Sequence, residues 1–447
     1  MSDLDLVLRG GTIITCDAND TVVQGDVLIR GDRIVAVGDV EAAPGARAVD
    51  ARGCIVMPGF VQAHVHLCQT LFRGFAEDAP LLEWLSQHIW PYEGAHTAES
   101  LYASARLGIS ELLLGGTTAA LDMGTVRHTD VIFQTAEKGG FRLTSGKAMM
   151  DKGHMRPGGL KETTDESLRL SDEVASRWHG KADGRLRYAF APRFILSCTD
   201  TALIECAKLA RKRGCLIHTH ASENPGEVEA VREATGGKSN IRALHDLGIS
   251  GKDVVLAHCV WLESEERRLL VETNTRVAHC PSTNLKLASG VADIPGLLAA
   301  GVTVGIGADG APCNNRMSAF TEMRLASLLQ KPKLGAGAMP ARDVVKMATM
   351  GGARVLGIDD QVGSLEKGKR ADVIVVDTMA PHMRPRSDPF ASLVFAAEAS
   401  DVKHVFVDGQ WLVRDKRLVR WELEDVIADA ETAIDEVLVR AGGSKRA

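Results

Sequence analysis

Short runs of alternating apolar and polar residues mark both ends of the chain. Between residues 4 and 58 they are divided by Gly and Asp, as in DVLIRGDRIVAVGD, and the pattern returns in HVFVDGQWLVRDKRLV at 404–419. Alternation with a period of two predicts strands with one buried face. Neither β-rich piece is long enough to bury a core of its own. We therefore expect the two pieces to pair into one discontinuous β-sandwich.

Continuous apolar runs separated by helix-like segments fill the middle of the chain. The runs that indicate buried strands are CIVMPGFVQAH, TTAALDM, FRLTSGKAMM, LRYAFAPR, CLIHTHA, DVVLAHC, RVAHCP and VTVGIGAD. Helical periodicity follows them, for example at 99–114 and 201–214. Eight buried strands that alternate with helices over about 300 residues are typical of a TIM barrel. We predict an α/β protein with a (β/α)8 barrel, and a doubly wound sheet is the competing layout.

These patterns divide the chain into four expected stretches. Residues 1–58 form the first part of the β-sandwich, and residues 59–363 form the barrel. Residues 364–420 complete the β-sandwich, and residues 421–447 form a C-terminal helix and tail.

The composition is that of an ordinary globular protein, with 447 residues of which 45% are hydrophobic and 25% charged. A net charge of −6 gives no electrostatic attraction to nucleic acid or to an anionic membrane. Nine cysteines without a C-x-x-C motif indicate reduced thiols, and the acidic N-terminus is unlike a signal peptide. No apolar stretch reaches the roughly 18 residues of a membrane span. We expect a cytoplasmic protein that binds neither nucleic acid nor membrane.

Two histidines one residue apart, His64 and His66, follow an apolar run near the start of the predicted barrel. On a strand, residues i and i+2 face the same side, so both imidazoles point together. They lie near the C-terminal end of the first barrel strand, which is where barrel enzymes build their sites. Two neutral imidazoles supply two of the ligands that Zn²⁺ prefers. Alone, the pair also fits a chance arrangement of core or surface histidines.

Three other predicted strands end in residues of the same chemistry. The fifth strand closes with His218-Thr-His220 and is followed by Glu223, the sixth ends in His258, and the eighth ends in Asp309. Because the C-terminal ends of barrel strands share one mouth, we predict a metal site there. Glu223, three residues after His220, is suited to act as a general base on metal-activated water.

The remaining members of this set have more than one interpretation. Asp309 is able both to bind a metal and to accept a proton from the attacking water. His258 is either a further ligand or the group that orients that water, and we favour orientation. His218 shares the face of His220, and we favour a satisfied histidine of the barrel interior.

Three further signals receive structural interpretations. The G-x-G-x-x-G pattern at 305–310 ends a predicted strand instead of opening a helix, so we discount a dinucleotide fingerprint. Lys147 lies at the end of the third strand and is expected to be structural or to face the substrate. The less favoured alternative is a carboxylated lysine that bridges two metal ions. His279 is expected to line the pocket.

The motifs around these residues resemble those of a known family. PGFVQAHVH, HTHASENPGEV, LAHCVWL, HCPSTNLKLASG, GIGADGAPCNN and GSLEKGKRADVIVVD are similar to motifs of the amidohydrolase superfamily. The similarity is closest to the branch that holds guanine deaminase, adenosine-derivative deaminases and triazine hydrolases. It implies a distorted (β/α)8 barrel, a composite β-sandwich and one divalent metal ion, zinc or iron. By motif position, it implies the metal ligands His64, His66, His220 and Asp309.

The resemblance also implies a reaction. The family typically uses metal-activated water to replace an amino group on a ring carbon, with release of ammonia. Glu223 would take a proton from the water and pass it to a ring nitrogen, and Asp309 would deliver a second proton to the leaving ammonia. His258 would stand beside them. The expected partners are a small aminated heterocycle, water and further copies of the chain in a homo-oligomer.

Residues beside the predicted metal site suggest the substrate. Gln69, Arg193 and Phe194 match residues with which guanine deaminases hold the purine, and Glu93 matches a ribose-binding residue of adenosine-type deaminases. In those adenosine-type enzymes a histidine normally occupies the place of Arg193. After Asp309, GADGAPCNN departs from the guanine deaminase pattern and resembles the adenosine-derivative and triazine groups. We predict a purine-type aminohydrolase acting on guanine, which is slightly favoured, or on an adenosine derivative of the 5'-deoxyadenosine, methylthioadenosine or S-adenosylhomocysteine class.

Two alternatives remain open. One is a triazine or pterin aminohydrolase, or an N-ethylammeline-type chlorohydrolase, and Glu223 counts against those chlorohydrolases that replace this glutamate. The other is a non-catalytic scaffold with the same fold. Such a scaffold is expected to lose metal-ligand residues, whereas this chain keeps the full set.

Overall fold

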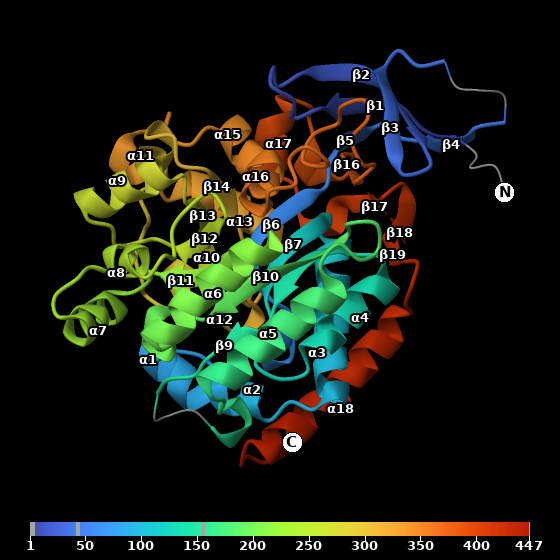
Figure 1. Ribbon diagram of the computed structural model, residues 1–447. Helices are drawn as coiled ribbons and strands as arrows, with labels where there is room; N and C mark the ends of the chain where they lie inside the picture. The colour runs from blue at the N-terminus through green and yellow to red at the C-terminus, as the bar shows by residue number, and fades with distance from the viewer. Residues whose placement is uncertain (1–4, 42–44, 154–156, 447) are drawn as a thin grey trace.

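The computed structural model describes residues 5–41, 45–153 and 157–446, which form two β-sheets surrounded by helices (Figure 1). One sheet is a parallel barrel from the middle of the chain. The other combines strands from both chain ends, which lie side by side although they are far apart in the sequence. This arrangement confirms the predicted fold class. In the part of the chain that is described, no helix combines the length and the apolar character needed to cross a bilayer.

Eight parallel strands form the barrel in chain order. They are β6 (Phe60–His66), β7 (Thr117–Met123), β8 (Arg142–Gly146), β10 (Leu186–Pro192), β11 (Leu216–Ala221), β12 (Val254–His258), β13 (Arg276–His279) and β14 (Val304–Ile306), and β9 (Ala148–Met149) adds a short pairing to β10. The eighth strand is interrupted, because β14 pairs with β13 whereas β15 (Asp309–Gly310) pairs with β6. The ring therefore closes through two short segments, and the distortion falls where the chain presents Asp309.

Side-chain hydrogen bonds and a glycine support this interrupted strand. Gln62 Oε1 on β6 accepts a hydrogen bond of 2.8 Å from Ala308 N, and its Nε2 donates to Met317 O at 3.1 Å. A Cβ at Gly307 would lie 2.6 Å from the carbonyl oxygen of His64, so only glycine permits this close approach. The strand that carries the first two histidines is thus fixed directly against the segment that carries Asp309.

The second sheet joins the two ends of the chain. Its strand order is β19-β18-β17-β16-β5-β1-β2-β3, and β4 also pairs with β1. Its strands are β1 (Leu6–Ile14), β2 (Val22–Arg30), β3 (Arg33–Gly38), β4 (Arg47–Asp50), β5 (Cys54–Pro58), β16 (Val373–Asp377), β17 (Val402–Val407), β18 (Gln410–Arg414) and β19 (Arg417–Leu418). The two halves meet where β16 runs antiparallel to β5. The expected pairing of the two chain ends is confirmed.

The run CIVMPGFVQAH, predicted as one strand, is divided between the two sheets. β5 ends at Pro58 and belongs to the second sheet, whereas β6 begins at Phe60 and opens the barrel. Gly59 lies between them, and a Cβ there would be 2.1 Å from Thr118 Oγ1 on β7. Glycine lets the backbone pass from one sheet to the other against this neighbour, a steric requirement that the apolar pattern does not reveal.

A buried ion-pair network fixes the barrel to the second sheet. Arg142 on β8 donates to both carboxylate oxygens of Asp372 at 2.8 and 2.9 Å, and it also donates to Asp408. All three side chains are buried. Such a bidentate pair gives a defined orientation as well as attraction. The barrel and the sheet are therefore held in one arrangement.

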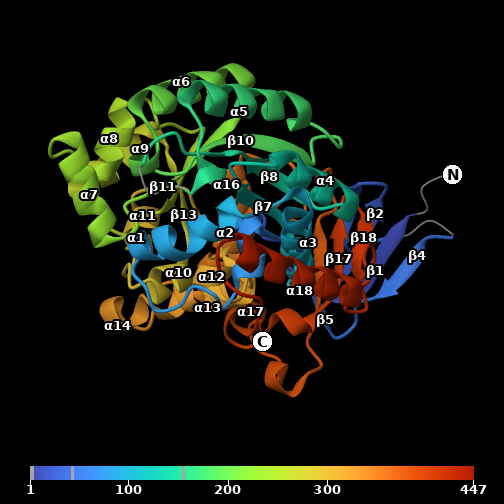
Figure 2. The same cartoon turned by 90° about the horizontal axis from the view of Figure 1, so that it is seen from below.

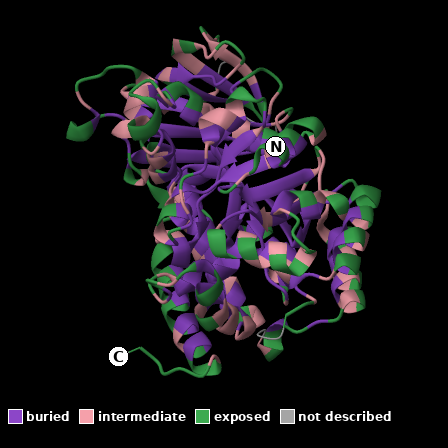
Figure 3. Cartoon of the chain, turned by 90° about the vertical axis from the view of Figure 1, so that its left-hand side faces the viewer, coloured by how far each residue is buried: buried purple, intermediate pink, exposed green. Residues whose placement is uncertain are grey.

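Helices cover the outside of the barrel (Figure 2). The longer ones are α3 (Ala98–Leu114), α4 (Thr129–Gly139), α5 (Thr164–Trp178), α6 (Asp200–Arg213), α9 (Ser264–Thr273), α13 (Ala319–Leu328) and α18 (Leu423–Arg440). The C-terminal helix α18 packs along α3, where Asp429 forms an ion pair of 2.7 Å with Arg106. Figure 3 shows the strands largely buried and the outer faces of the helices exposed.

Candidate active site

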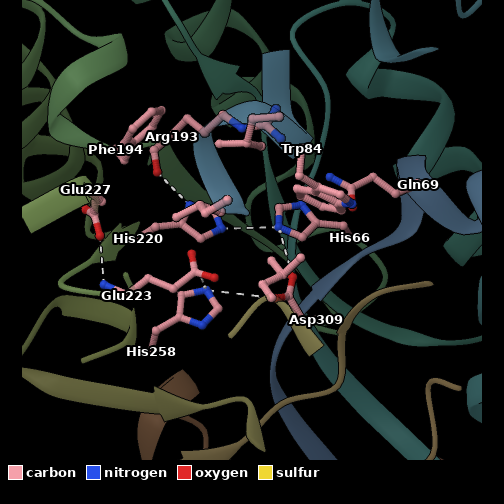
Figure 4. Close-up of a pocket in the computed structure, with 13 residues that line it drawn as sticks. His66, Gln69, Trp84, Arg193, Phe194, His220, Glu223, Glu227, His258 and Asp309 are labelled. Atoms are coloured by element: carbon pink, nitrogen blue, oxygen red, sulfur yellow. Dashed lines mark hydrogen bonds and ion pairs between the residues drawn. The ribbon is translucent and has the colours of Figure 1, made fainter. Parts of the chain in front are cut away.

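Residues from three strand ends converge at the C-terminal mouth of the barrel (Figure 4). His66 Nε2 lies 3.3 Å from His220 Nε2 and 3.4 Å from Asp309 Oδ1. His64 Nε2 lies 3.2 Å from the same Asp309 oxygen, but it makes no hydrogen bond. His64 and His66 come from the end of β6, His220 from β11 and Asp309 from β15. The structure therefore brings together the four residues whose motif positions implied a metal site.

The outward ring nitrogens of His66 and His220 are held by backbone carbonyl groups. His66 Nδ1 donates to Met123 O at 2.9 Å, and His220 Nδ1 donates to Arg193 O at 2.7 Å. A carbonyl oxygen accepts only, so each Nδ1 carries the proton and each Nε2 offers its lone pair toward the interior of the cluster. Imidazole nitrogens held in this way are characteristic ligands of Zn²⁺ and related cations. The donor set fits a divalent cation.

Burial determines the charge of this cluster. It lowers the pKa of His66 to about 3, with a further lowering by the neighbouring His64, and it lowers that of His220 well below its usual value. Burial raises the pKa of Asp309, but His64, His258 and His66 outweigh it and hold that pKa well below its usual range. At neutral pH His66 and His220 are thus neutral imidazoles and Asp309 is an ionised carboxylate. This is the protonation state in which these groups bind metal ions.

Glu223 and His258 lie beside the cluster. His258 Nε2 is 3.5 Å from Glu223 Oε2 and 3.8 Å from Asp309 Oδ2, and its Nδ1 donates to Asn284 Oδ1 at 2.9 Å. Burial, Asp309 and Glu227 together raise the pKa of Glu223 well above its usual value. A carboxyl group with a raised pKa is able to take up and release a proton near neutral pH.

The position of Glu223 depends on a residue that the sequence reasoning missed. Glu227, in the first turn of α7 (Pro225–Thr235), accepts a hydrogen bond of 2.7 Å from the backbone N–H of Glu223. Its other oxygen accepts from Asn240 Nδ2 at 2.6 Å, and its side chain is buried and lines the pocket. The spacing E-x-x-x-E after a strand was the sequence signal for Glu227 as a site residue. An acidic residue in the first turn of a helix is also common, because it stabilises the helix N-terminus.

The predicted substrate residues form one buried network. Arg193 donates to Glu93 through Nη1 at 2.5 Å and Nη2 at 3.1 Å, and Gln69 Nε2 donates to Glu93 Oε1 at 2.8 Å. Gln69, Arg193 and Phe194 line the pocket, whereas Glu93 lies behind them and is not among the lining residues. Gln69 Oε1 is buried without a partner, so it is the acceptor that this wall offers to a ligand.

Another part of the lining is apolar and comes from a segment that the motifs did not assign to the site. Leu81 and Trp84 of α1 (Leu81–Trp84) and Leu85 of the π-helix η2 (Leu85–Ile89) line the pocket, together with Leu287. A single π-turn within a helix is often associated with a functional site. Trp84 Nε1 donates to Ala76 O at 3.0 Å, which fixes the indole ring. The apolar run PLLEWLSQHIW was the signal, but it also fits an ordinary core helix.

Three other residues singled out in the sequence lie away from the pocket surface. His218 is buried behind the cluster, with Nε2 2.8 Å from His64 Nδ1. His279 is buried at the end of β13 and is absent from the described lining residues, contrary to expectation. Lys147 forms a buried ion pair with Glu162, which agrees with a structural role.

Comparison with known proteins extends these observations. The family model described as amidohydrolase family matches residues 55–412. The chain is 40% identical over 435 residues to the 5-methylthioadenosine/S-adenosylhomocysteine deaminase of Symbiobacterium thermophilum, with 96% of this chain and 98% of that protein covered. It is also 40% identical over 439 residues to the 5'-deoxyadenosine deaminase of Methanothermobacter thermautotrophicus, with coverage of 98% and 100%.

A solved structure shares the fold over nearly its whole length. The adenosine deaminase of Xanthomonas campestris, crystallised with bound zinc, superimposes with a TM-score of 0.91 and 31% sequence identity. The match covers 97% of this chain and 98% of that one. This similarity supports a divalent metal ion as the cofactor and a small aminated heterocycle as the type of substrate.

Proposed function

Because this chain belongs to the amidohydrolase family, we propose that it is a hydrolytic deaminase of an adenosine derivative of the 5'-deoxyadenosine, methylthioadenosine or S-adenosylhomocysteine class. The predicted enzyme class, a hydrolase that acts on C–N bonds, agrees with the names of both relatives. We propose zinc as the cation, held by His64, His66, His220 and Asp309.

One observation carries this proposal. Neutral imidazoles and an ionised carboxylate meet in a buried pocket, and Glu223 with its raised pKa stands beside them. A non-catalytic scaffold has no need of a buried acid with a raised pKa beside a cluster of metal-ligand residues. The combination fits hydrolysis, because this reaction needs an activated water and a group that transfers its protons.

The mechanism assigns a task to each of these side chains. A divalent cation, when bound, lowers the pKa of water and so supplies the nucleophile. Glu223 takes a proton from the attacking water and passes it to a ring nitrogen of the substrate. Asp309 takes the second proton and delivers it to the amino group, which leaves as ammonia. His258, whose Nδ1 is held by Asn284, directs Nε2 toward the attacking oxygen.

The sequence motifs alone slightly favoured guanine as the substrate. Two features now favour an adenosine derivative instead. Both relatives that match over nearly their whole length act, by their names, on adenosine derivatives. Leu81, Trp84 and Leu85 also give the pocket an apolar wall, which suits the uncharged 5' group of deoxyadenosine or methylthioadenosine. Guanine stays the second candidate because Gln69 and Arg193 also line the pocket.

The proposal is tested by ammonia release from a panel of substrates. Zinc-loaded protein is incubated with 5'-deoxyadenosine, methylthioadenosine, S-adenosylhomocysteine, guanine, a pterin and an aminated triazine. We expect the highest kcat/KM among the three adenosine derivatives, with loss of activity after chelation and recovery on addition of zinc. A higher value for guanine would reject the adenosine class, and chloride release from a chlorinated triazine without any ammonia would reject deamination.

Substitution of Arg193 tests the polar part of the pocket lining. In Arg193→Ala the buried carboxylate of Glu93 loses its partner, so we expect unfolding free energy to fall by about 3–5 kcal/mol. KM for the best substrate should rise while zinc content stays unchanged, because Arg193 contributes to the pocket and not to the ligand cluster. Denaturant unfolding, steady-state kinetics and metal analysis measure the three quantities.

A matched control and a second variant separate the two effects of Arg193→Ala. Arg187→Ala changes an arginine at the opposite end of the same strand and should leave KM unchanged. Adding Glu93→Gln to Arg193→Ala removes the unpaired charge, so stability should recover in part while KM stays high. Unaltered kinetics in Arg193→Ala would show that this residue does not hold the substrate.

A further inference from the structure

His218 is paired with a histidine of the ligand cluster. It lies on β11 two residues before His220, and its Nε2 is 2.8 Å from His64 Nδ1. The two rings are nearly perpendicular, at 83°, and both side chains are fully buried. Water therefore does not compete for this hydrogen bond, and the two imidazoles share one proton between these nitrogens.

The location of that proton decides whether His64 is able to bind a cation. When His64 Nδ1 carries the proton, His64 Nε2 has a free lone pair that faces the cluster. When His218 Nε2 carries it instead, neutral His64 must be protonated on Nε2, and its lone pair is directed away from the cluster. Only the first arrangement leaves His64 as a ligand. In it, His218 is an acceptor through Nε2 and a donor through Nδ1.

The other histidines of the cluster differ in one respect. His66 and His220 donate to backbone carbonyl groups, which only accept, so their tautomers are set by the main chain. His64 has no such carbonyl partner among the described hydrogen bonds, and a side chain takes its place. His218 Nδ1 is itself buried without a partner, which is an unfavourable arrangement for a residue that serves packing alone.

We propose that His218 is a positioning residue that accepts the hydrogen bond from His64 Nδ1 and so keeps His64 Nε2 available for the divalent cation. The inference rests on the proposed function only in that it uses the same cation site. Partners that orient metal-bound imidazoles in this way commonly contribute a factor of about 10 to 100 in metal affinity. His218 is thus predicted to act on the cation through His64 without touching the substrate.

Two substitutions distinguish this role from packing. His218→Gln keeps an acceptor oxygen at about the same reach, whereas His218→Leu fills the space without any acceptor. We expect His218→Leu to lower zinc affinity about 10- to 100-fold and to change the visible absorption of the cobalt-substituted protein. His218→Gln should restore most of the affinity and a spectrum close to that of the original protein. His404→Leu, at a buried histidine on β17 of the second sheet, is the control and should leave both unchanged.

These measurements need no substrate, so they stand even if the panel of heterocycles gives no ammonia. Zinc affinity and a cobalt spectrum in His218→Leu that equal those of the original protein would overturn the proposal. An equally large loss of zinc affinity in His218→Gln would overturn it as well. If His218→Leu does not fold, nitrogen-15 NMR of the zinc-loaded original protein decides the matter. The His64 ring should then carry its proton on Nδ1, and a proton on Nε2 would overturn the proposal.

Discussion

Replacement of Glu223 by glutamine should lower kcat by about 10²- to 10⁴-fold while the protein keeps its divalent cation. The amide has nearly the same shape but does not accept a proton from water or deliver one to a ring nitrogen. Glu223 is outside the proposed ligand set, and its Oε2 lies 3.5 Å from Nε2 of His258, which is also outside that set. Burial and the charges of Asp309 and Glu227 raise its pKa, so removing this acid also removes unfavourable repulsion. We expect unchanged or higher stability.

Ammonia release and metal analysis on the same preparation measure the result. Glu229→Gln is the matched control, because Glu229 lies on α7, the helix that follows Glu223, with a side chain that is 66% exposed. It should behave like the original protein in both assays. Full activity in Glu223→Gln would show that another group transfers the proton, and loss of the cation would show that Glu223 is a ligand.

The barrel was predictable from the sequence because its strands are buried on both faces. Such strands appear as continuous apolar runs, and TTAALDM coincides with β7. Two interruptions within these apolar runs depend on contacts between distant segments. The break after Pro58 requires Thr118 against Gly59, and the break within the eighth strand requires Gln62 against Ala308. Apolar periodicity carries no information about such contacts.

The convergence of the proposed ligand residues was predictable for a topological reason. The C-terminal ends of parallel barrel strands lie at one mouth, so His66, His220 and Asp309 meet although they are far apart in the sequence. Their partners were not predictable in the same way. Glu93 comes from a helix and Arg193 from the end of a strand, and the sequence does not indicate that these two elements meet. Only the fold shows that the two side chains form an ion pair.

The role of His218 shows the same limit at shorter range. The spacing H-x-H placed it on the same strand face as His220, which left ligation and burial in the barrel interior as alternatives. The structure shows it buried in the barrel interior, as favoured, and its partner there is a proposed ligand histidine of another strand. A spacing rule fixes the direction of a side chain, whereas its partner depends on which strand lies next to it.

Replacement of Asp309 by asparagine should reduce both cation binding and turnover, unlike the change at Glu223. Asp309 is the one carboxylate among the four proposed ligands, and its pKa is held well below the usual range by His64, His258 and His66. Its φ of 62° lies in the left-handed region, which asparagine adopts readily, so the backbone should be unchanged. We expect kcat to fall at least about 10²-fold. Asp415→Asn, at an exposed position with φ of 50°, is the control.

Titration with zinc separates the two tasks of Asp309. If it served only as a ligand, excess zinc would restore both the bound cation and the rate of ammonia release in Asp309→Asn. Because we also assign it the proton that leaves with ammonia, we expect saturating zinc to refill the site while kcat stays low. Recovery of full activity would show that Asp309 does not transfer a proton and that Glu223 transfers both. Normal zinc content without any addition would show that the cluster binds its cation without this carboxylate.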